Sequence, residues 1–231
     1  VNVDYRRAPE HPYPAALEDA VASVKWLLNN NEYNLSPSSP IHFAGESAGG
    51  NIALSLALAT AYRIEEPWAQ EVFALETQPQ STTSVSGLLQ VSNPGRLDQN
   101  RRLPSIIRDR IFEASRDYLP NSFLNPKGAP FLADPIRLLE SDHTPVKPVP
   151  RIFAAVGTRD PVFDDTYRLH RLSETKKLQI ESYIHEGELH AFHTMLWRDA
   201  ARKFWVDWIG FLDRFESRKA SARWSNAGVT A

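Results

Sequence analysis

The sequence of 231 residues contains no cysteine, no strong excess of either charge and no long apolar run. The absence of cysteine excludes disulfide bonds and thiolate metal sites, and fits a reducing, cytoplasmic compartment without requiring one. The sequence has 26 Lys and Arg residues and 28 Asp and Glu residues, so there is no excess of positive charge to bind nucleic acid or an anionic membrane. No apolar run approaches the roughly 20 residues of a membrane-spanning helix. A hydrophobic content of 42% is enough to fill the core of one large domain.

The hydrophobic pattern alternates between the periods of strands and helices. Short apolar runs predict strands, and longer stretches with apolar residues three and four positions apart predict helices. The predicted strands are 1–5, 40–45, 84–91, 151–157 and 178–184, and the predicted helices are 14–30, 47–63, 161–175 and 194–215. A polar loop is expected up to residue 83. This order predicts an α/β fold with a mostly parallel sheet and helices on both faces.

Two segments interrupt the alternation. Residues 92–147 are rich in Pro, Asn and Arg and contain one amphipathic segment, IIRDRIFEASRDYL, so they are interpreted as a cap inserted over the end of the sheet. Residues 217–231 lack periodicity and are expected to form a loose tail. The prediction is therefore one α/β domain over residues 1–216, with the cap inside it.

The stretch FAGESAGGN, residues 43–51, contains the pattern G-x-S-x-G between a predicted strand and a predicted helix. In that context the pattern indicates a nucleophile elbow, with Ser47 on a strained turn and Gly45 and Gly49 leaving room for the close approach of strand and helix. The start of the helix would then offer the Ala48 N–H to an oxyanion. The alternative is a glycine-rich turn whose serine only caps the helix.

A serine nucleophile needs a histidine base and a carboxylate that orients it. Asp160 follows one predicted strand and His190 lies in the loop after the next, in the order Ser, Asp, His. Asp160 before a proline is also a good helix cap. The other candidates rank lower, because each suits a surface, helix-start or capping role: the carboxylates Asp164 and Asp165, and the histidines His185 and His193. No metal constellation is visible in the sequence.

Four blocks resemble the hormone-sensitive-lipase-like esterases of the α/β-hydrolase superfamily. They are VDYRRAPEHPYPAALEDA, GESAGGN, RDPVFDD and GELHAFH, and the resemblance extends from residue 1 to about 215. It implies hydrolysis of carboxylic esters with short or medium acyl groups, without a cofactor, by a triad of Ser47, Asp160 and His190. It also implies that the block from Tyr5 to Pro14 is a loop that braces the site.

The sequence departs from this family in three places. The chain begins inside an expected strand and shows no His-Gly-Gly-Gly oxyanion loop, so we expect an N-terminally truncated member. Arg7 stands where relatives often have an apolar residue, and Ala191 where many have glycine. Two alternative functions stay open. One is a catalytically dead pseudoenzyme or small-ligand receptor on the same fold, like the gibberellin receptors, which lack the catalytic histidine. The other is a prolyl-oligopeptidase-type peptidase.

Inserted segments above strand ends are where such folds place specificity. The cap residues Ile107, Ile111, Phe112 and Tyr118 are therefore predicted to wall the pocket for the acyl or alcohol group of a small ester substrate. The oligomeric state is not indicated by the sequence.

Overall fold

The computed structural model describes residues 1–33, 35, 39–99, 104–120 and 123–226. Within this part of the chain, a four-stranded sheet has the order β1-β2-β3-β4 and every neighbouring pair is parallel. Its strands are β1 (His42–Glu46), β2 (Ser81–Val85), β3 (Arg151–Gly157) and β4 (Ile180–His185). Because the strands are parallel, their carboxyl ends meet along one edge of the sheet, where the loops that follow them converge.

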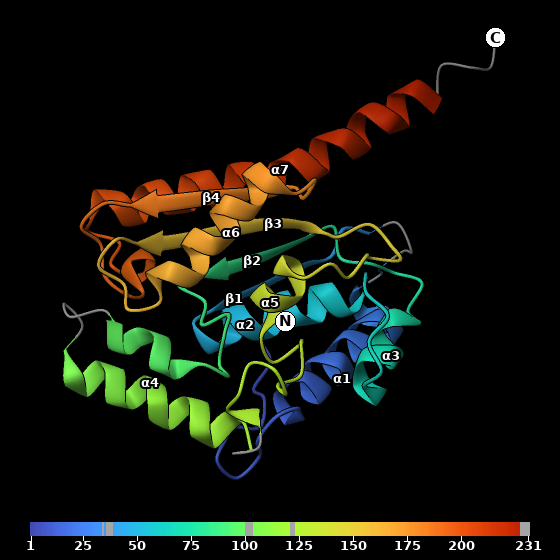
Figure 1. Cartoon of the computed structure of the whole chain (residues 1–231). Coiled ribbons are helices and arrows are strands. Elements are labelled where there is room, and N and C mark those ends of the chain that lie inside the picture. Colours follow the sequence, from blue (N-terminus) through green and yellow to red (C-terminus); the bar gives the residue numbers. More distant parts are fainter. Residues whose placement is uncertain (34, 36–38, 100–103, 121–122, 227–231) are drawn as a thin grey trace.

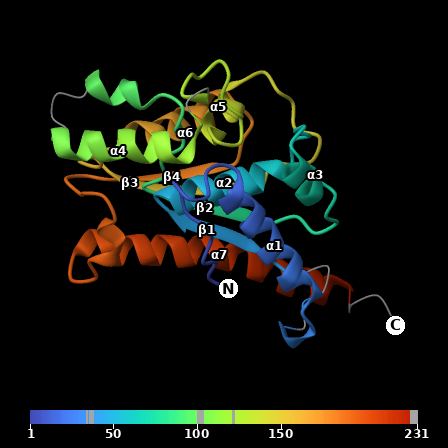
Figure 2. The ribbon, with the colours of Figure 1, turned by 90° about the horizontal axis from the view of Figure 1, so that it is seen from below.

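Helices cover both faces of the sheet (Figures 1 and 2). One face carries α1 (Ala15–Asn29), α2 (Ala48–Ala59), α3 (Pro67–Phe73), α5 (Pro135–Glu140) and α6 (Phe163–Thr175), and the other carries α7 (Asp199–Asn226). Side chains of a strand alternate between faces. In β3, Ile152 and Ala154 accordingly join the core under α2 and α6, whereas Phe153 and Ala155 join the aromatic core under α7. The predicted α/β fold is confirmed.

The strand predictions succeed best where both faces are buried. The predicted range 151–157 is that of β3, and β1 and β4 lie within one or two residues of their predicted positions. The prediction of a strand at 84–91 is wrong: β2 is the polar segment STTSV at 81–85, and a loop follows it. The prediction of a strand at 1–5 is also wrong, because this segment pairs with no strand among the described residues.

Two helices differ from the prediction. The polar region before residue 83 was expected to be a loop, but it contains α3, which begins with proline at its first positions and buries Trp68, Ala69 and Val72. The helix expected at 194–215 begins at Asp199 and continues to Asn226, so residues 217–226 are helical where a loose tail was expected. The remaining tail residues, 227–231, lie outside the described part. Among the described residues, no helix combines the length and the apolar character that crossing a membrane demands.

The segment predicted as a cap, 92–147, contains a short 3-10 helix at Pro94–Gln99, then α4 (Ser105–Tyr118) and α5. Figure 1 shows α4 beside the carboxyl ends of the strands, outside the layers that cover the sheet. Only Ser115 of α4 is buried, whereas α5 buries Ile136, Leu138 and Leu139 in the main core. The segment therefore joins the core through α5 and extends over the strand ends through α4.

Candidate active site

Ser47 sits on a strained turn between β1 and α2. Its backbone has φ 54° and ψ −116°, a conformation that costs a non-glycine residue of order 1–3 kcal/mol. A Cβ added to Gly45 would lie 2.1 Å from the carbonyl oxygen of Gly49, so only glycine fits there. The expectation that Gly49 is equally constrained is wrong, because a Cβ on Gly49 would meet no described atom within 4 Å. The second tight position is Gly50, whose added Cβ would lie 2.7 Å from Ser84 Oγ.

The backbone on both sides of Ser47 is fixed. The Ser47 N–H donates to Val85 O at 2.9 Å, and the Ser47 carbonyl accepts from Asn51 N at 3.2 Å. The hydroxyl makes no capping bond to α2, which decides against a serine that only caps the helix. Ala48 is the first residue of α2, where backbone N–H groups have no partner within the helix. The elbow therefore places the Ser47 hydroxyl, which does not cap the helix, beside the Ala48 N–H, a potential oxyanion donor.

Asp160 and His190 meet at the carboxyl ends of β3 and β4. The His190 ring nitrogen Nδ1 lies 3.1 Å from both carboxylate oxygens of Asp160, whose side chain is fully buried. Asp160 also accepts a bond from the Val162 N–H at 2.9 Å, so it caps the turn before α6 as well. The two roles weighed from the sequence are thus compatible, because one carboxylate serves both.

The electrostatics of His190 suit a base. Its pKa is raised, chiefly by the hydrogen bond to Asp160, against the lowering effect of burial and with a further increase from the charge of Glu46. With Nδ1 bound to Asp160, Nε2 is the ring nitrogen left to take a proton. Ser47 Oγ forms no hydrogen bond with His190 among the described residues; such contacts are often long in unliganded sites and shorten when substrate binds.

Glu46, next to Ser47, connects the elbow to the histidine loop. Its Oε2 lies 3.6 Å from Nε2 of His193, and its charge also raises the pKa of His190. Burial lowers the pKa of His193, which packs against Phe204 and Trp205. The sequence reasoning missed Glu46, although its place inside the G-x-S-x-G pattern was the available signal.

The loop that carries His190 is held closely against the end of β3. Gly157 approaches the loop so tightly that an added Cβ would lie 2.1 Å from the Glu188 carbonyl oxygen, which also accepts from Arg159 N at 3.0 Å. Ala191 has φ 58°, the left-handed region that favours glycine. This conformation explains why glycine suits the position. His185, another histidine ranked below His190 in the sequence, is buried at the end of β4 against Phe192, and its Nε2 has no hydrogen-bond partner among the described residues.

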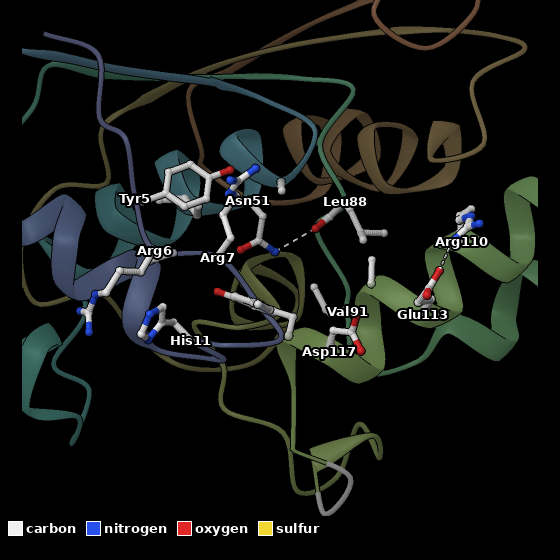
Figure 3. Close-up of a pocket in the computed structure, with 16 residues that line it drawn as sticks. Tyr5, Arg6, Arg7, His11, Asn51, Leu88, Val91, Arg110, Glu113 and Asp117 are labelled. Atoms are coloured by element: carbon white, nitrogen blue, oxygen red, sulfur yellow. Dashed lines mark hydrogen bonds and ion pairs between the residues drawn. The ribbon is translucent and has the colours of Figure 1, made fainter.

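A cavity of about 370 Å³ opens beside the elbow (Figure 3). Its walls come from the segment after the N-terminus, the start of α1, the start of α2, the loop after β2, and α4: Tyr5, Arg6, Arg7, Ala8, His11, Ala16, Ala48, Asn51, Ile52, Leu88, Val91, Arg110, Glu113, Ala114, Asp117 and Tyr118. Because Ala48 lines it, the cavity reaches the residue that follows Ser47.

Of the four residues predicted as pocket walls, only Tyr118 lines this cavity. The turns of α4 present Arg110, Ala114 and Asp117 to it instead, while Ile107 is 39% exposed and Phe112 borders a separate surface hollow with Arg108 and Arg116. Ile111 is half-buried outside the cavity. The apolar stripe of α4 thus does not coincide with its cavity face, which sequence periodicity alone could not show.

The block from Tyr5 to Pro14 braces one side of the cavity, as the resemblance implied. Arg6 bonds to Asp19 through its backbone N–H at 2.8 Å and its side chain at 3.0 Å, and to Glu18 at 2.9 Å. Tyr13 donates to Glu66 at 2.5 Å. The neighbouring Arg7 lines the cavity, so the departure noted in the sequence adds a cation to its wall.

A family model described as alpha/beta hydrolase fold matches residues 1–194. The chain belongs to this family. The match covers both loops with the proposed base and carboxylate, the elbow and the segment around α4. Together with relatives named esterase and hormone-sensitive lipase, it confirms the resemblance to hormone-sensitive-lipase-like esterases. Among the described residues, no group of three or more His, Asp or Glu side chains could hold a metal ion.

Individual relatives agree with this assignment. The chain is 31% identical to the esterase LipI of Mycobacterium tuberculosis over 192 residues, which are 83% of this chain and 55% of LipI. It is 43% identical to the gibberellin receptor GID1A of Arabidopsis thaliana over 60 residues, which are 25% of this chain and 17% of the receptor. A crystal structure of an esterase from the bacterial hormone-sensitive lipase family has the same fold, with a TM-score of 0.60 and 22% identity over 82% of this chain and 56% of that chain. The chain thus spans about half the length of the esterase relatives it matches.

Proposed function

We propose that this chain carries the catalytic centre of a serine hydrolase that cleaves carboxylic esters through an acyl-enzyme on Ser47. The observation that carries the proposal is the bond from His190 to the buried Asp160, 30 residues away in sequence, at the sheet edge where Ser47 occupies a strained elbow. The named esterases among the relatives support the same reaction class. The relatives are longer than this chain, so their activity is part of the proposal.

In the proposed mechanism, His190 accepts the Ser47 proton on Nε2 as Oγ attacks the ester carbonyl. Asp160 fixes the tautomer with the other proton on Nδ1 and stabilises the imidazolium that forms. The Ala48 N–H, at the positive end of α2, stabilises the negative charge on the carbonyl oxygen. The histidine then protonates the leaving alkoxide, and water activated by the same base releases the acid.

The cavity beside Ala48 is the proposed site of the acyl or alcohol group. Its volume of about 370 Å³ suits a small molecule. Ala48, Ile52, Leu88 and Val91 supply an apolar surface to it, which favours an alkyl chain. We therefore propose short to medium acyl esters as substrates, with Tyr118 in contact with the bound group.

Ester turnover by matched serine variants tests the proposal. Ser47→Ala should abolish hydrolysis of p-nitrophenyl butyrate and leave the circular dichroism spectrum unchanged. Ser105→Ala, at the exposed start of α4, is the control and should retain wild-type turnover. Turnover by Ser47→Ala at the wild-type rate would refute the assignment of the nucleophile.

The likeness to a gibberellin receptor supports a second candidate, a ligand-binding protein without catalysis. That likeness covers a quarter of the chain, and the His190 to Asp160 bond favours the enzyme. A fluorophosphonate reagent separates the two, because it reacts covalently only with an activated serine. Labelling of the wild-type chain that is lost in Ser47→Ala would exclude the receptor alternative.

A further inference from the structure

The loop of residues 86–92, which follows β2, connects the elbow to the cavity wall. The Leu88 N–H donates to the Ser47 carbonyl at 3.4 Å, and the Asn51 side chain donates to the Leu88 carbonyl at 2.8 Å. Leu88 and Val91 line the cavity, and Figure 3 shows the Asn51 to Leu88 bond at its edge. The position of this loop therefore sets both the shape of the wall and the support of the nucleophile's backbone.

From Leu89 to Ser92, the backbone N–H groups of this loop donate to side-chain carboxylates. Asp165 accepts from the N–H groups of Leu89 and Gln90 at 2.7 and 3.2 Å. Asp134 accepts from those of Val91 and Ser92 at 2.6 and 3.0 Å. Both carboxylate side chains are fully buried. Without these acceptors, the loop would bury backbone donors that have no partner, which is unfavourable.

The charge of Asp165 is balanced inside the protein. Its oxygens lie 2.6 and 2.7 Å from Nη2 of Arg96, and Arg168 lies 3.5 Å away on the same helix as Asp165. Arg168 also binds Glu140 at 2.6 and 2.7 Å and Gln90 at 2.7 Å. Burying an ion pair gains little net stability, because desolvation offsets the attraction. The main contribution of Asp165 is therefore to orient the backbone N–H groups of Leu89 and Gln90, which donate to it.

We propose that Asp165 is a positioning residue for the reaction, which acts through the loop 86–92 by holding Leu88 against the elbow and the cavity. The inference rests on the proposed function of Ser47, since the loop bonds to its backbone. Asp165 is not among the residues that line the cavity, and His190 bonds to Asp160 instead. The effect of Asp165 should therefore appear in the affinity for the alkyl group of the substrate, and it should grow with the length of that group.

Binding of an unreactive ester analogue tests this role in the intact chain. In a Ser47→Ala background, calorimetry measures the dissociation constants of N-butyl hexanamide and N-methyl acetamide. Asp165→Asn keeps the shape of the side chain but loses the charge that orders Arg96 and the two amides. The affinity for N-butyl hexanamide should therefore fall about tenfold, which is equivalent to one lost hydrogen bond to a charged group. Acetamide affinity should change less than about threefold, because it fills less of the cavity.

Glu140→Gln is the matched control. It removes a partner of Arg168 on the outer side, where Glu140 is 36% exposed, and leaves Asp165 and its amide bonds in place. Its hexanamide affinity should stay within about twofold of the background protein. A purely structural role of Asp165 would lower the melting temperature without changing the ratio of the two affinities.

A second variant covers the case in which Asp165→Asn does not fold. Arg96→Gln keeps the carboxylate but removes its main counter-charge, so it should weaken hexanamide binding about threefold with the same chain-length dependence. An unchanged affinity ratio in the folded variants would overturn the positioning role. Failure of Ser47 in the wild-type chain to react with a fluorophosphonate would instead count against the proposed function. The affinity ratio would still test the effect of Asp165 on binding.

Discussion

The catalytic rim and the cavity wall are fixed by different means. The catalytic rim, formed by the turns that carry Ser47, Asp160 and His190, depends on backbone contacts so close that glycine is required at Gly45 and Gly157. In the cavity wall, formed by the loop 86–92 and α4, the loop depends on side-chain carboxylates that accept from its backbone amides. In the proposed mechanism, close main-chain packing therefore fixes the turns that carry the reacting side chains, whereas buried carboxylates fix the loop that lines the cavity.

Asp160→Asn gives the largest expected effect, and it acts on the rim. Asparagine can still accept from Val162 N, but it does not select the tautomer of His190 needed for proton transfer. We expect kcat/KM for p-nitrophenyl butyrate to fall about 10⁴-fold, with little change in the melting temperature. A loss of less than tenfold would contradict the role of Asp160 as the orienting carboxylate.

Gly45→Ala breaks the rim through its backbone. The new methyl group would lie 2.1 Å from the Gly49 carbonyl oxygen, so strand and helix must separate. We expect the free energy of unfolding to fall by about 3 kcal/mol or more, measured by urea denaturation. Gly49→Ala is the control: it meets open space in a helix, and should be neutral or stabilise by up to about 1 kcal/mol. Equal losses in both variants would contradict the steric account of the elbow.

Asp134→Asn tests the wall without touching the rim. The Val91 and Ser92 amides and the Ser92 hydroxyl lose a charged acceptor, so the free energy of unfolding should fall by about 2 kcal/mol. Turnover of p-nitrophenyl acetate by the folded protein should stay within about threefold of wild type. If acetate turnover fell as far as in Asp160→Asn, the separation between rim and wall would be wrong.

Glu46→Gln gives the smallest expected effect and tests the electrostatic contribution of Glu46 to the rim. The charge of Glu46 raises the pKa of His190, and only the neutral imidazole acts as a base. Removing that charge should lower the pKa, so the acidic limb of kcat/KM should move to lower pH. The pH profile of ester hydrolysis measures this shift, and a limb that stays in place or moves to higher pH would contradict it.

The sequence was most informative where the constraint is local. The apolar run of β3 predicted that strand because both of its faces are buried, and the small residues around Ser47 marked the elbow. The loop at 86–92 resembled a strand in sequence, but Asp134 and Asp165 determine its course from distant positions. Such contacts are not encoded in local periodicity.

The candidate site likewise divides into parts that local motifs predict and parts that depend on packing between distant segments. The order of Ser47, Asp160 and His190 came from motifs at strand ends, and the structure places the last two in hydrogen-bond contact. The cavity face of α4 depends on how that helix packs against the N-terminal segment, where Tyr13 N donates to the Tyr118 carbonyl at 2.8 Å. For this reason the apolar positions of α4 did not identify the wall.

Mass spectrometry of an acid-quenched reaction tests the central claim most directly. After brief incubation of the chain with p-nitrophenyl butyrate, digestion should yield one butyrylated peptide, with the modification on Ser47, and this species should be absent in Ser47→Ala and strongly reduced in His190→Ala. Acylation at another residue, or the same yield of acylated Ser47 without His190, would contradict a nucleophile at the elbow activated by the histidine that Asp160 holds.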